Sequence, residues 1–169
     1  MKKSLISFVL ILTIIAAFSC SAFAYSPVTR VDGQIWETEP NDYAEDATII
    51  YQQGSTVYPT YGSIRYVYDG DHYLYQSNTT KTKTLRVGRN GGLTRVPDAG
   101  LYVGCYDLTS GDSICEEHVL VSKGATVTFQ AIAGHEYIIY VALEGPVDAI
   151  QEDLDMTGGQ GFRYLVSLP

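Results

Sequence analysis

Short apolar runs separated by turn residues recur along most of the chain. In residues 82–87 polar and apolar positions alternate, and in residues 72–76 His72 and Leu74 share one face while two tyrosines share the other. This period of two is typical of strands, whose successive side chains point to opposite faces of a sheet. Strands are predicted at residues 47–51, 58–66, 72–76, 82–87, 101–107, 114–121, 125–131, 136–143 and 162–168. With Gly, Asp and Asn between the runs, the pattern predicts an all-β fold: a jelly-roll-like, antiparallel β-sandwich of about 8–9 strands.

Helical periodicity is nearly absent. No long stretch places apolar residues at the spacing of an amphipathic helix, and only residues 147–154 are expected to form a short helical turn. Residues 89–92 (Arg-Asn-Gly-Gly) are expected to form an exposed loop. Trp36, the single tryptophan, is expected to be buried against the sandwich, because large aromatic side chains are mostly buried.

The N-terminal segment has the pattern of a secretory signal peptide. Lys2 and Lys3 precede an apolar stretch at residues 5–18, and the small-x-small triplet Ala22-Phe23-Ala24 precedes an expected cut before Tyr25. The apolar stretch of 14 residues is shorter than the roughly 20 that span a bilayer, so no membrane span is expected. We therefore predict a secreted, extracellular protein with a signal peptide at residues 1–24.

An alternative fate for the N-terminus is a lipid anchor. Cys20 is preceded by Ala17-Phe18-Ser19, which matches the usual lipoprotein cleavage motif poorly because of Phe18. Acylation of Cys20 would tether the protein to a membrane surface.

Composition sharpens this picture once the signal peptide is removed. The full chain of 169 residues has 11 basic and 19 acidic residues; without Lys2 and Lys3 the balance is 9 to 19, or −10. Such a charge argues against nucleic-acid binding, which needs a basic face. The remaining 145 residues suffice for one core. We expect a lead-in at residues 25–36, a single sandwich domain at residues 37–169, and a monomer.

Two cysteines remain after export, Cys105 and Cys115. The turn signal at residues 109–112 lies between them, and a hairpin there would place them opposite each other. Oxidising compartments favour disulfides for such even numbers. A redox pair would more typically be Cys-x-x-Cys, and a zinc site would need two further ligands, whereas the three histidines are scattered. We predict a structural disulfide.

The most informative segment is an acidic motif just before the first predicted strand. Glu37, Glu39, Asn41 and Asp42 lie within six residues, and alternation puts the first three on one side of an extended segment. A second acidic pair follows in Asp69-Gly70-Asp71. Carboxylates on one face repel each other, and a hard cation such as calcium, which takes six to eight oxygens, would remove that cost. The alternative is a solvated acidic lead-in, with the later pair as turn residues.

These motifs resemble the bacterial pre-peptidase C-terminal domain family, which includes the collagen-binding domains of clostridial collagenases. The resemblance rests on Glu-x-Glu-Pro-Asn-Asp at 37–42, Gly-Ser-Ile at 62–64, Asp-x-Asp-x-Tyr at 69–73, Ala-Gly-x-x-Tyr at 133–137 and Tyr-Leu-Val at 164–166. It spans residues 36–168 and implies a β-sandwich accessory domain. The calcium ligands that it implies are Glu37, Glu39, Asn41, Asp42, Asp69 and Asp71, with an oxygen of Ser63 as an addition.

The resemblance also bears on a binding surface. Collagen-binding members use tyrosines on late strands, and Tyr137 matches one such position, although the position of a partner tyrosine holds Val141. The paired cysteines depart from the usual family pattern, and the module is expected to stand alone behind its signal peptide, without the protease domain that usually accompanies it. The resemblance therefore implies Tyr137 as a contact residue.

Enzyme motifs are missing from the sequence. It contains neither Gly-x-Ser-x-Gly nor His-Glu-x-x-His. Carboxylate pairs such as Glu116-Glu117 or Glu152-Asp153 keep a small secreted hydrolase open as an alternative, and a lipid-anchored structural protein is a third hypothesis. The main hypothesis is a non-catalytic binding or accessory module, stabilised by calcium, that contacts an extracellular protein or polysaccharide.

Overall fold

The fold is an all-β sandwich. The computed structural model describes residues 29–31, 33–89, 100–155, 157–158 and 161–169. The six strands of one sheet lie in the order β1 (Thr29–Val31), β2 (Gln34–Trp36), β6 (Thr60–Ile64), β13 (Phe162–Ser167), β8 (Lys81–Arg89) and β11 (Ala125–Ala131). The five strands of the other lie in the order β10 (Asp112–Leu120), β9 (Gly100–Asp107), β12 (Glu136–Glu144), β7 (Gly70–Gln76) and β3 (Thr48–Ile49).

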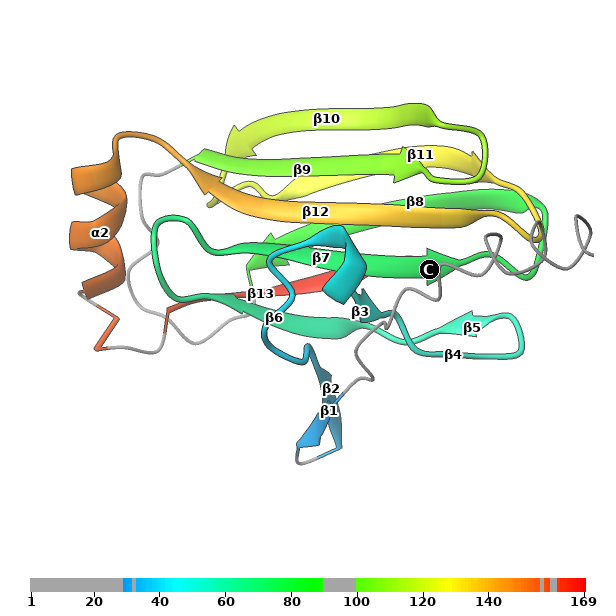
Figure 1. Ribbon diagram of the computed structural model, residues 1–169, viewed down its shortest axis with the longest axis horizontal. Coiled ribbons are helices and arrows are strands. Elements are labelled where there is room, and N and C mark those ends of the chain that lie inside the picture. The colour runs from blue at the N-terminus through cyan, green and yellow to red at the C-terminus, as the bar shows by residue number, and fades with distance from the viewer. Residues whose placement is uncertain (1–28, 32, 90–99, 156, 159–160) are drawn as a thin grey trace, which may run out of the picture.

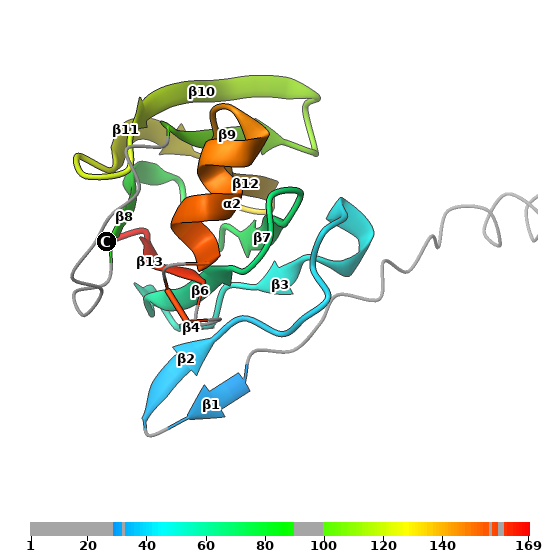
Figure 2. The same ribbon diagram turned by 90° about the vertical axis from the view of Figure 1, so that its left-hand side faces the viewer.

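Three small elements complete the described chain. A two-stranded hairpin, β4 (Gln52–Gln53) with β5 (Thr56–Val57), lies at one end of the sandwich, and helix α2 (Val147–Asp155) lies across the other (Figure 1). A single 3₁₀ turn, η1 (Ala44–Asp46), follows the acidic motif. Figure 2, which looks at the sandwich from the α2 end, shows the helix in front of the strands of both sheets.

Most neighbouring strands are antiparallel. Strands β9, β12 and β7 are paired over most of their length, with Tyr137 opposite both Tyr75 and Asp107. Two short pairings are parallel: β2 with β6, and β3 with β7. Both involve the segment around the acidic motif, which runs from β2, next to the edge of one sheet, to β3 at the edge of the other. The motif therefore lies where the two layers meet.

The core between the sheets is unusually rich in tyrosine. Its largest buried side chains include Tyr73, Tyr75, Tyr137 and Tyr164, each 0% exposed. Aliphatic residues from both sheets pack around them, as the inward positions of alternating strands require. Lys83 is also buried, and its ammonium group donates a hydrogen bond to the carbonyl oxygen of Leu168 at 3.0 Å. Part of the tyrosine excess is thus structural.

The sandwich and the helix at residues 147–155 confirm the sequence predictions, but three details differ. The described chain has more strands than predicted, because pairs such as Gln52–Gln53 are too short to show alternation. The expected lead-in contains a hairpin, since β1 and β2 are paired. Trp36 is only half-buried, because its indole stacks outside the core on Tyr61. Residues 1–24 with Cys20, and most of the predicted loop at 89–92, lie outside the described residues.

Candidate metal centre

The acidic motif and the start of β7 meet at one place. Glu37 directly follows β2, and its backbone N–H donates to the carbonyl oxygen of Tyr61 on β6. Asp71 belongs to β7, and the next N–H along that strand, from His72, donates to the carbonyl oxygen of Asn41. Backbone hydrogen bonds therefore fix both segments against neighbouring strands, so their side chains converge without depending on a mobile loop.

Three carboxylates lie close together at this meeting point. One oxygen from each of Glu37, Glu39 and Asp71 lies within 4.8 Å of the others. Glu37 and Asp71 are buried, and Glu39 is exposed, so the group opens toward solvent on one side. Three like charges at such distances repel strongly where water is largely excluded.

The side-chain amide of Asn41 completes the group. One of its two terminal atoms lies 2.8 Å from Oε2 of Glu39 and 3.2 Å from Oδ1 of Asp71. If this atom is the nitrogen, it donates to both carboxylates. If it is the oxygen, the nitrogen instead lies 3.5 Å from Oε2 of Glu37 and from Oγ1 of Thr48, and oxygens alone converge. The second arrangement is the one that a hard cation requires.

Two buried tyrosines form the floor of the site. The hydroxyl of Tyr73 donates to Oε2 of Glu37, and the hydroxyl of Tyr164 on β13 donates to Oδ2 of Asp71. The two hydroxyl oxygens lie 2.7 Å apart. The backbone N–H of Ser63 donates to Oε1 of Glu37 at 2.5 Å. The backbone N–H of Ser63 thus supplies a donor to the site, and its role as an oxygen ligand stays a prediction.

The remaining two predicted residues lie beside this group. Asp69 is 2% exposed; its Oδ2 accepts a hydrogen bond from the N–H of Arg65 at 2.6 Å, whereas its Oδ1 is buried with no hydrogen-bond partner. Asp42 neighbours Asp69 and also accepts a hydrogen bond from the hydroxyl of Tyr66 at 3.0 Å. An orphaned buried carboxylate oxygen is rare in folded proteins and indicates a missing partner.

Burial dominates the electrostatics of the group. It raises the pKa of Glu37 to about 7 and that of Asp69 to about 7, with Glu39 adding to both shifts. Burial, followed by repulsion from Glu37, holds the pKa of Asp71 well above its usual range. Burial also raises the pKa of Glu39, against the attraction of Arg65. Within the described residues, Arg65 is the only cationic side chain among the causes of these four shifts, so the negative charge is under-compensated.

The structure therefore brings all six predicted ligand residues into one neighbourhood. They fit a calcium ion by chemistry: carboxylates with an amide oxygen, one orphaned oxygen, and a rim open to solvent. Sequence reasoning missed the hydroxyls of Tyr73 and Tyr164. Strand periodicity assigns each tyrosine to one face of its strand. Nothing in the sequence shows that Tyr73 on β7 and Tyr164 on β13 come together.

The predicted contact role of Tyr137 is wrong. Its side chain is 0% exposed, and its ring stacks on Tyr75 with centroids 5.9 Å apart. Its hydroxyl accepts a hydrogen bond from the N–H of Ile132. Alternation placed Tyr137 on one face of its strand but could not show that this face points into the sandwich.

The predicted disulfide has the expected strand register but not the bond. Cys105 and Cys115 are directly opposite each other across β9 and β10, beside a register shift between Ser113 and Cys115. Both are free thiols in the structure. A hydrogen bond between the thiols raises the pKa of Cys105 and lowers that of Cys115. Directly opposed residues are typically about 4.5–5.5 Å apart at Cβ, slightly wider than a disulfide needs. The bond itself therefore stays a prediction.

The acidic pairs considered for hydrolysis are not assembled into a site by the described residues. Glu116 and Glu117 are consecutive on β10, so they point to opposite faces of the sheet. Glu116 accepts a hydrogen bond from the hydroxyl of Tyr106. Glu152 is exposed on α2, and the side chain of Asp153 is outside the described set. The hydrolase alternative has no observation in its favour.

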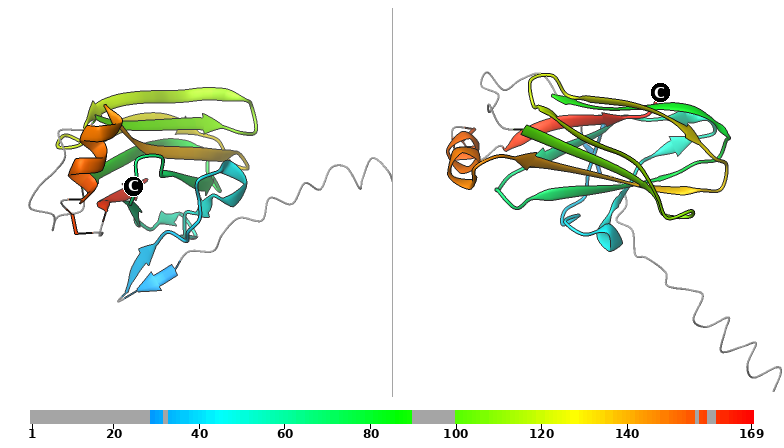
Figure 3. Two further views of the ribbon diagram at one scale, coloured as in Figure 1. Left: turned by 60° about the vertical axis from the view of Figure 1, so that its left-hand side comes forward. Right: turned by 90° about the horizontal axis from the view of Figure 1, so that it is seen from above.

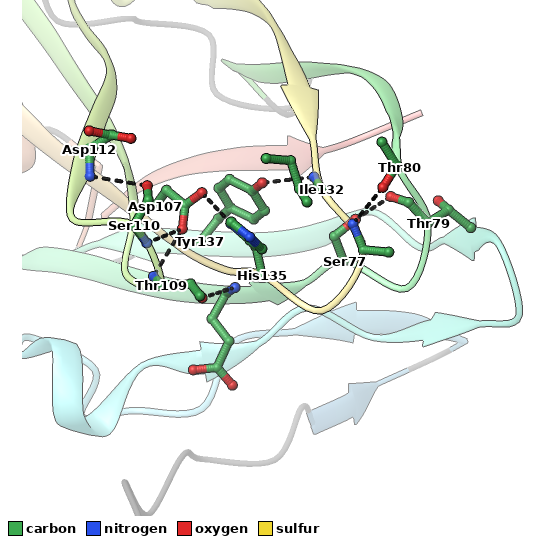
Figure 4. A network of polar contacts seen from close by, with 12 residues as sticks. Ser77, Thr79, Thr80, Asp107, Thr109, Ser110, Asp112, Ile132, His135 and Tyr137 are labelled. Carbon is green, nitrogen blue, oxygen red and sulfur yellow. Dashed lines mark hydrogen bonds and ion pairs between the residues drawn. The ribbon is translucent and has the colours of Figure 1, made fainter.

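A second polar network, which the sequence did not reveal, joins two turns at the end of the sandwich opposite α2 (Figure 4). Nδ1 of His135 lies 2.7 Å from Oδ2 of Asp107, and Oδ1 of Asp107 accepts hydrogen bonds from the N–H groups of Thr109 and Ser110. Asp107 is 3% exposed. Burial opposes ionisation, but His135 and the two N–H groups hold the pKa of Asp107 below its usual range. The network has the character of a structural clamp.

The fold and the carboxylate group together define a β-sandwich module with a candidate cation site at its entry. A scan against family models found no match, and a search of curated proteins found no relative. Among solved structures, the chain is similar to the pre-peptidase C-terminal domain of a collagenase from Bacillus anthracis, with 14% identity over 66% of this chain and 87% of that chain and a TM-score of 0.44. That domain belongs to the family which the sequence motifs resemble.

A second similar structure is the Aeromonas hydrophila protein PliG, a periplasmic inhibitor of g-type lysozyme. It shares 16% identity over 73% of this chain and 97% of that chain, with a TM-score of 0.41. The function proposed for the present chain rests on its own side chains.

Proposed function

We propose that this chain is an exported, non-catalytic binding module whose fold is stabilised by one calcium ion. Glu37, Glu39, Asn41, Asp69 and Asp71 would hold the ion, with Asp42 at the rim. The observation that carries the proposal is the gathering of three carboxylates within 4.8 Å beside a buried carboxylate oxygen that has no partner. A bound cation would remove the repulsion and supply that partner.

The role of the ion would be structural. Glu37 follows β2 of the six-stranded sheet, and Asp71 lies on β7 of the five-stranded sheet. An ion held by both would cross-link the two layers at the point where the chain passes between them. The module would then present its sheets to an extracellular protein or polysaccharide as a rigid monomer. No helix among the described residues is long and apolar enough to cross a membrane.

Thermal melting with calcium, magnesium or EDTA tests the ion site. Calcium at about 100 times its dissociation constant should stabilise the fold by about 2.7 kcal/mol, and Asp71→Asn should abolish this shift. Asp112→Asn is the matched control, because Asp112 is an exposed aspartate on β10. An unchanged melting temperature in excess calcium would exclude the site.

The pH dependence of the calcium effect gives an independent reading. The carboxyl groups of Glu37 and Asp69 have pKa values raised to about 7 in the folded state. The fold favours the protonated form of these two carboxyl groups, and this stabilisation is complete below about pH 4, where they are protonated in the unfolded chain as well. It is lost as the pH rises toward 7, because the groups then ionise more readily in the unfolded chain than in the fold. Calcium should offset this loss, so the calcium-induced shift should be larger at pH 8 than at pH 5. A shift of equal size at both pH values would contradict carboxylate ligation.

A further inference from the structure

The two sheets differ completely in the sign of their charged side chains. The five strands β10, β9, β12, β7 and β3 contain seven Asp and Glu and not one Lys or Arg. The six strands of the other sheet contain six Lys and Arg and not one Asp or Glu. Figure 3 shows the two layers from above. Of the seven acidic residues, Asp71 and Asp107 are buried. Glu116 and Glu144 lie on the outer face of the sheet, where no Lys or Arg of its own strands neutralises them.

Aromatic rings cross this same outer face in one continuous row. His72, Tyr140, Tyr102 and His118 come from β7, β12, β9 and β10, the strands that lie side by side in Figure 1. Successive ring centroids are 4.6, 5.7 and 5.0 Å apart. We call this row the aromatic stripe. None of its members is buried, in contrast to the tyrosines of the core.

Glycines lie beneath the two tyrosines of the stripe. A Cβ on Gly70 would lie 2.6 Å from Cε2 of Tyr140, and one on Gly104 would lie 3.2 Å from the hydroxyl of Tyr102. The tyrosine rings therefore lie over bare backbone instead of standing away from the sheet. The hydroxyls of Tyr102 and Tyr106 are 2.9 Å apart, which holds the rings in place. Rings fixed before binding lose little conformational entropy when a partner docks.

Carboxylates flank the stripe. Both oxygens of Glu144 lie 2.9 Å from Nδ1 of His118, and Glu116 accepts a hydrogen bond from the hydroxyl of Tyr106 at 2.9 Å. Side chains of His118 and Glu144 are 59% and 39% exposed. Aromatic faces with adjacent carboxylates suit a guanidinium group, which stacks on rings and pairs with carboxylates at the same time. A neutral ligand would use only the rings.

We propose that the aromatic stripe, with Glu116 and Glu144, docks an arginine-rich surface of a partner protein. This deepens the proposed binding function by naming the surface and the chemistry of its partner. The basic sheet of a second copy is a less suitable partner for the stripe. Contact between two different faces of the same chain is heterologous, and such contacts generate open filaments when they do not close into a ring.

Binding of a fluorescent arginine–glycine repeat peptide, followed by anisotropy at low salt, tests the proposal. The double variant Glu116→Gln with Glu144→Gln should weaken binding about tenfold. The control Glu152→Gln with Asp155→Asn removes the same two charges from α2 and should change the affinity less than about twofold. Tyr102→Leu, which removes no charge, should also weaken binding, and a glutamine–glycine peptide should not bind.

Each contrary result has its own meaning. Equal losses in both double variants would show binding to net charge alone and would overturn the proposal. Binding of a neutral polysaccharide that is lost in Tyr102→Leu but unchanged in the Gln variants would also overturn it, by assigning the stripe to glycans. Oligomers of the wild-type protein in analytical sedimentation that are lost in the Glu116/Glu144 double variant would assign the aromatic stripe to contact with a second copy. A ligand unaffected by Tyr102→Leu would refute this surface while leaving the proposed binding function standing.

Discussion

Gly62 lies beneath the candidate metal centre, and replacing it by alanine should disturb the site from below. A Cβ at this position would lie 2.5 Å from Cζ and 2.7 Å from the hydroxyl of Tyr164, and closer still to the hydroxyl of Tyr73. Both hydroxyls donate to the site carboxyl groups of Glu37 and Asp71. Neither tyrosine is at a flexible surface, since both are 0% exposed. The Cβ therefore can be accommodated only if a ring moves.

The size of the effect follows from these contacts. Overpacking in a core costs about 1–3 kcal/mol, and each hydrogen bond to a carboxyl group contributes about 1.5–3 kcal/mol. If the methyl group breaks one of the two bonds, Gly62→Ala should destabilise the fold by about 2.5–6 kcal/mol. For a domain of this size, the melting temperature should fall by at least about 10 °C.

Gly88→Ala is the matched control, because it makes the same substitution in a strand of the same sheet. A Cβ on Gly88 would meet no atom within 4 Å, so this variant should be neutral or slightly stabilising. Circular dichroism melts of both variants are the assay. Equal melting temperatures for the two variants would refute the reasoning. If Gly62→Ala does not fold, Tyr164→Phe removes one hydroxyl alone and should cost about 1.5–3 kcal/mol.

Three other predictions concern the rest of the chain. His135→Ala should cost about 1–2 kcal/mol at pH 7. Asp107, whose folded-state pKa is lowered, stabilises the fold above pH 4 and loses this effect as the pH falls. Thermal melts of the variant should therefore show a weaker dependence of stability on acid pH, and an unchanged pH dependence would refute the clamp. Mild oxidation should remove two hydrogens by joining Cys105 and Cys115 and add about 2–3 kcal/mol, whereas an unchanged mass would refute the bond. Mass spectrometry of the exported protein should give an N-terminus at Tyr25, and an acylated cysteine would contradict that cut.

The sequence was informative where local pattern decides structure. Period-two alternation identified the long strands, and the helical turn predicted at residues 147–154 is the α-helix at residues 147–155. The acidic motif gave the ligand candidates, because two clusters of closely spaced acids stand out in any reading. The hairpin β4–β5 was missed, since strands of two residues cannot show a period.

What depends on the pairing of distant strands could not be predicted. Tyr137 and Tyr140 lie three residues apart on β12, so alternation puts them on opposite faces without showing which face is buried. In the structure Tyr137 is fully buried and Tyr140 belongs to the outer face. Only the packing of the second sheet distinguishes these faces. The charge separation between the sheets cannot be seen along the chain for the same reason, because the strands of the two sheets are interleaved in sequence.

The position of β13 has a consequence for the order of folding. This strand follows all the others in sequence, yet it lies between β6 and β8 in the middle of its sheet, and its Tyr164 contacts the candidate metal centre. The six-stranded sheet therefore cannot close while residues 162–167 are still being synthesised or translocated. A chain threaded through a secretion channel from its N-terminus would remain open until its last strand emerges, and truncation before residue 162 should leave two central strand edges unpaired.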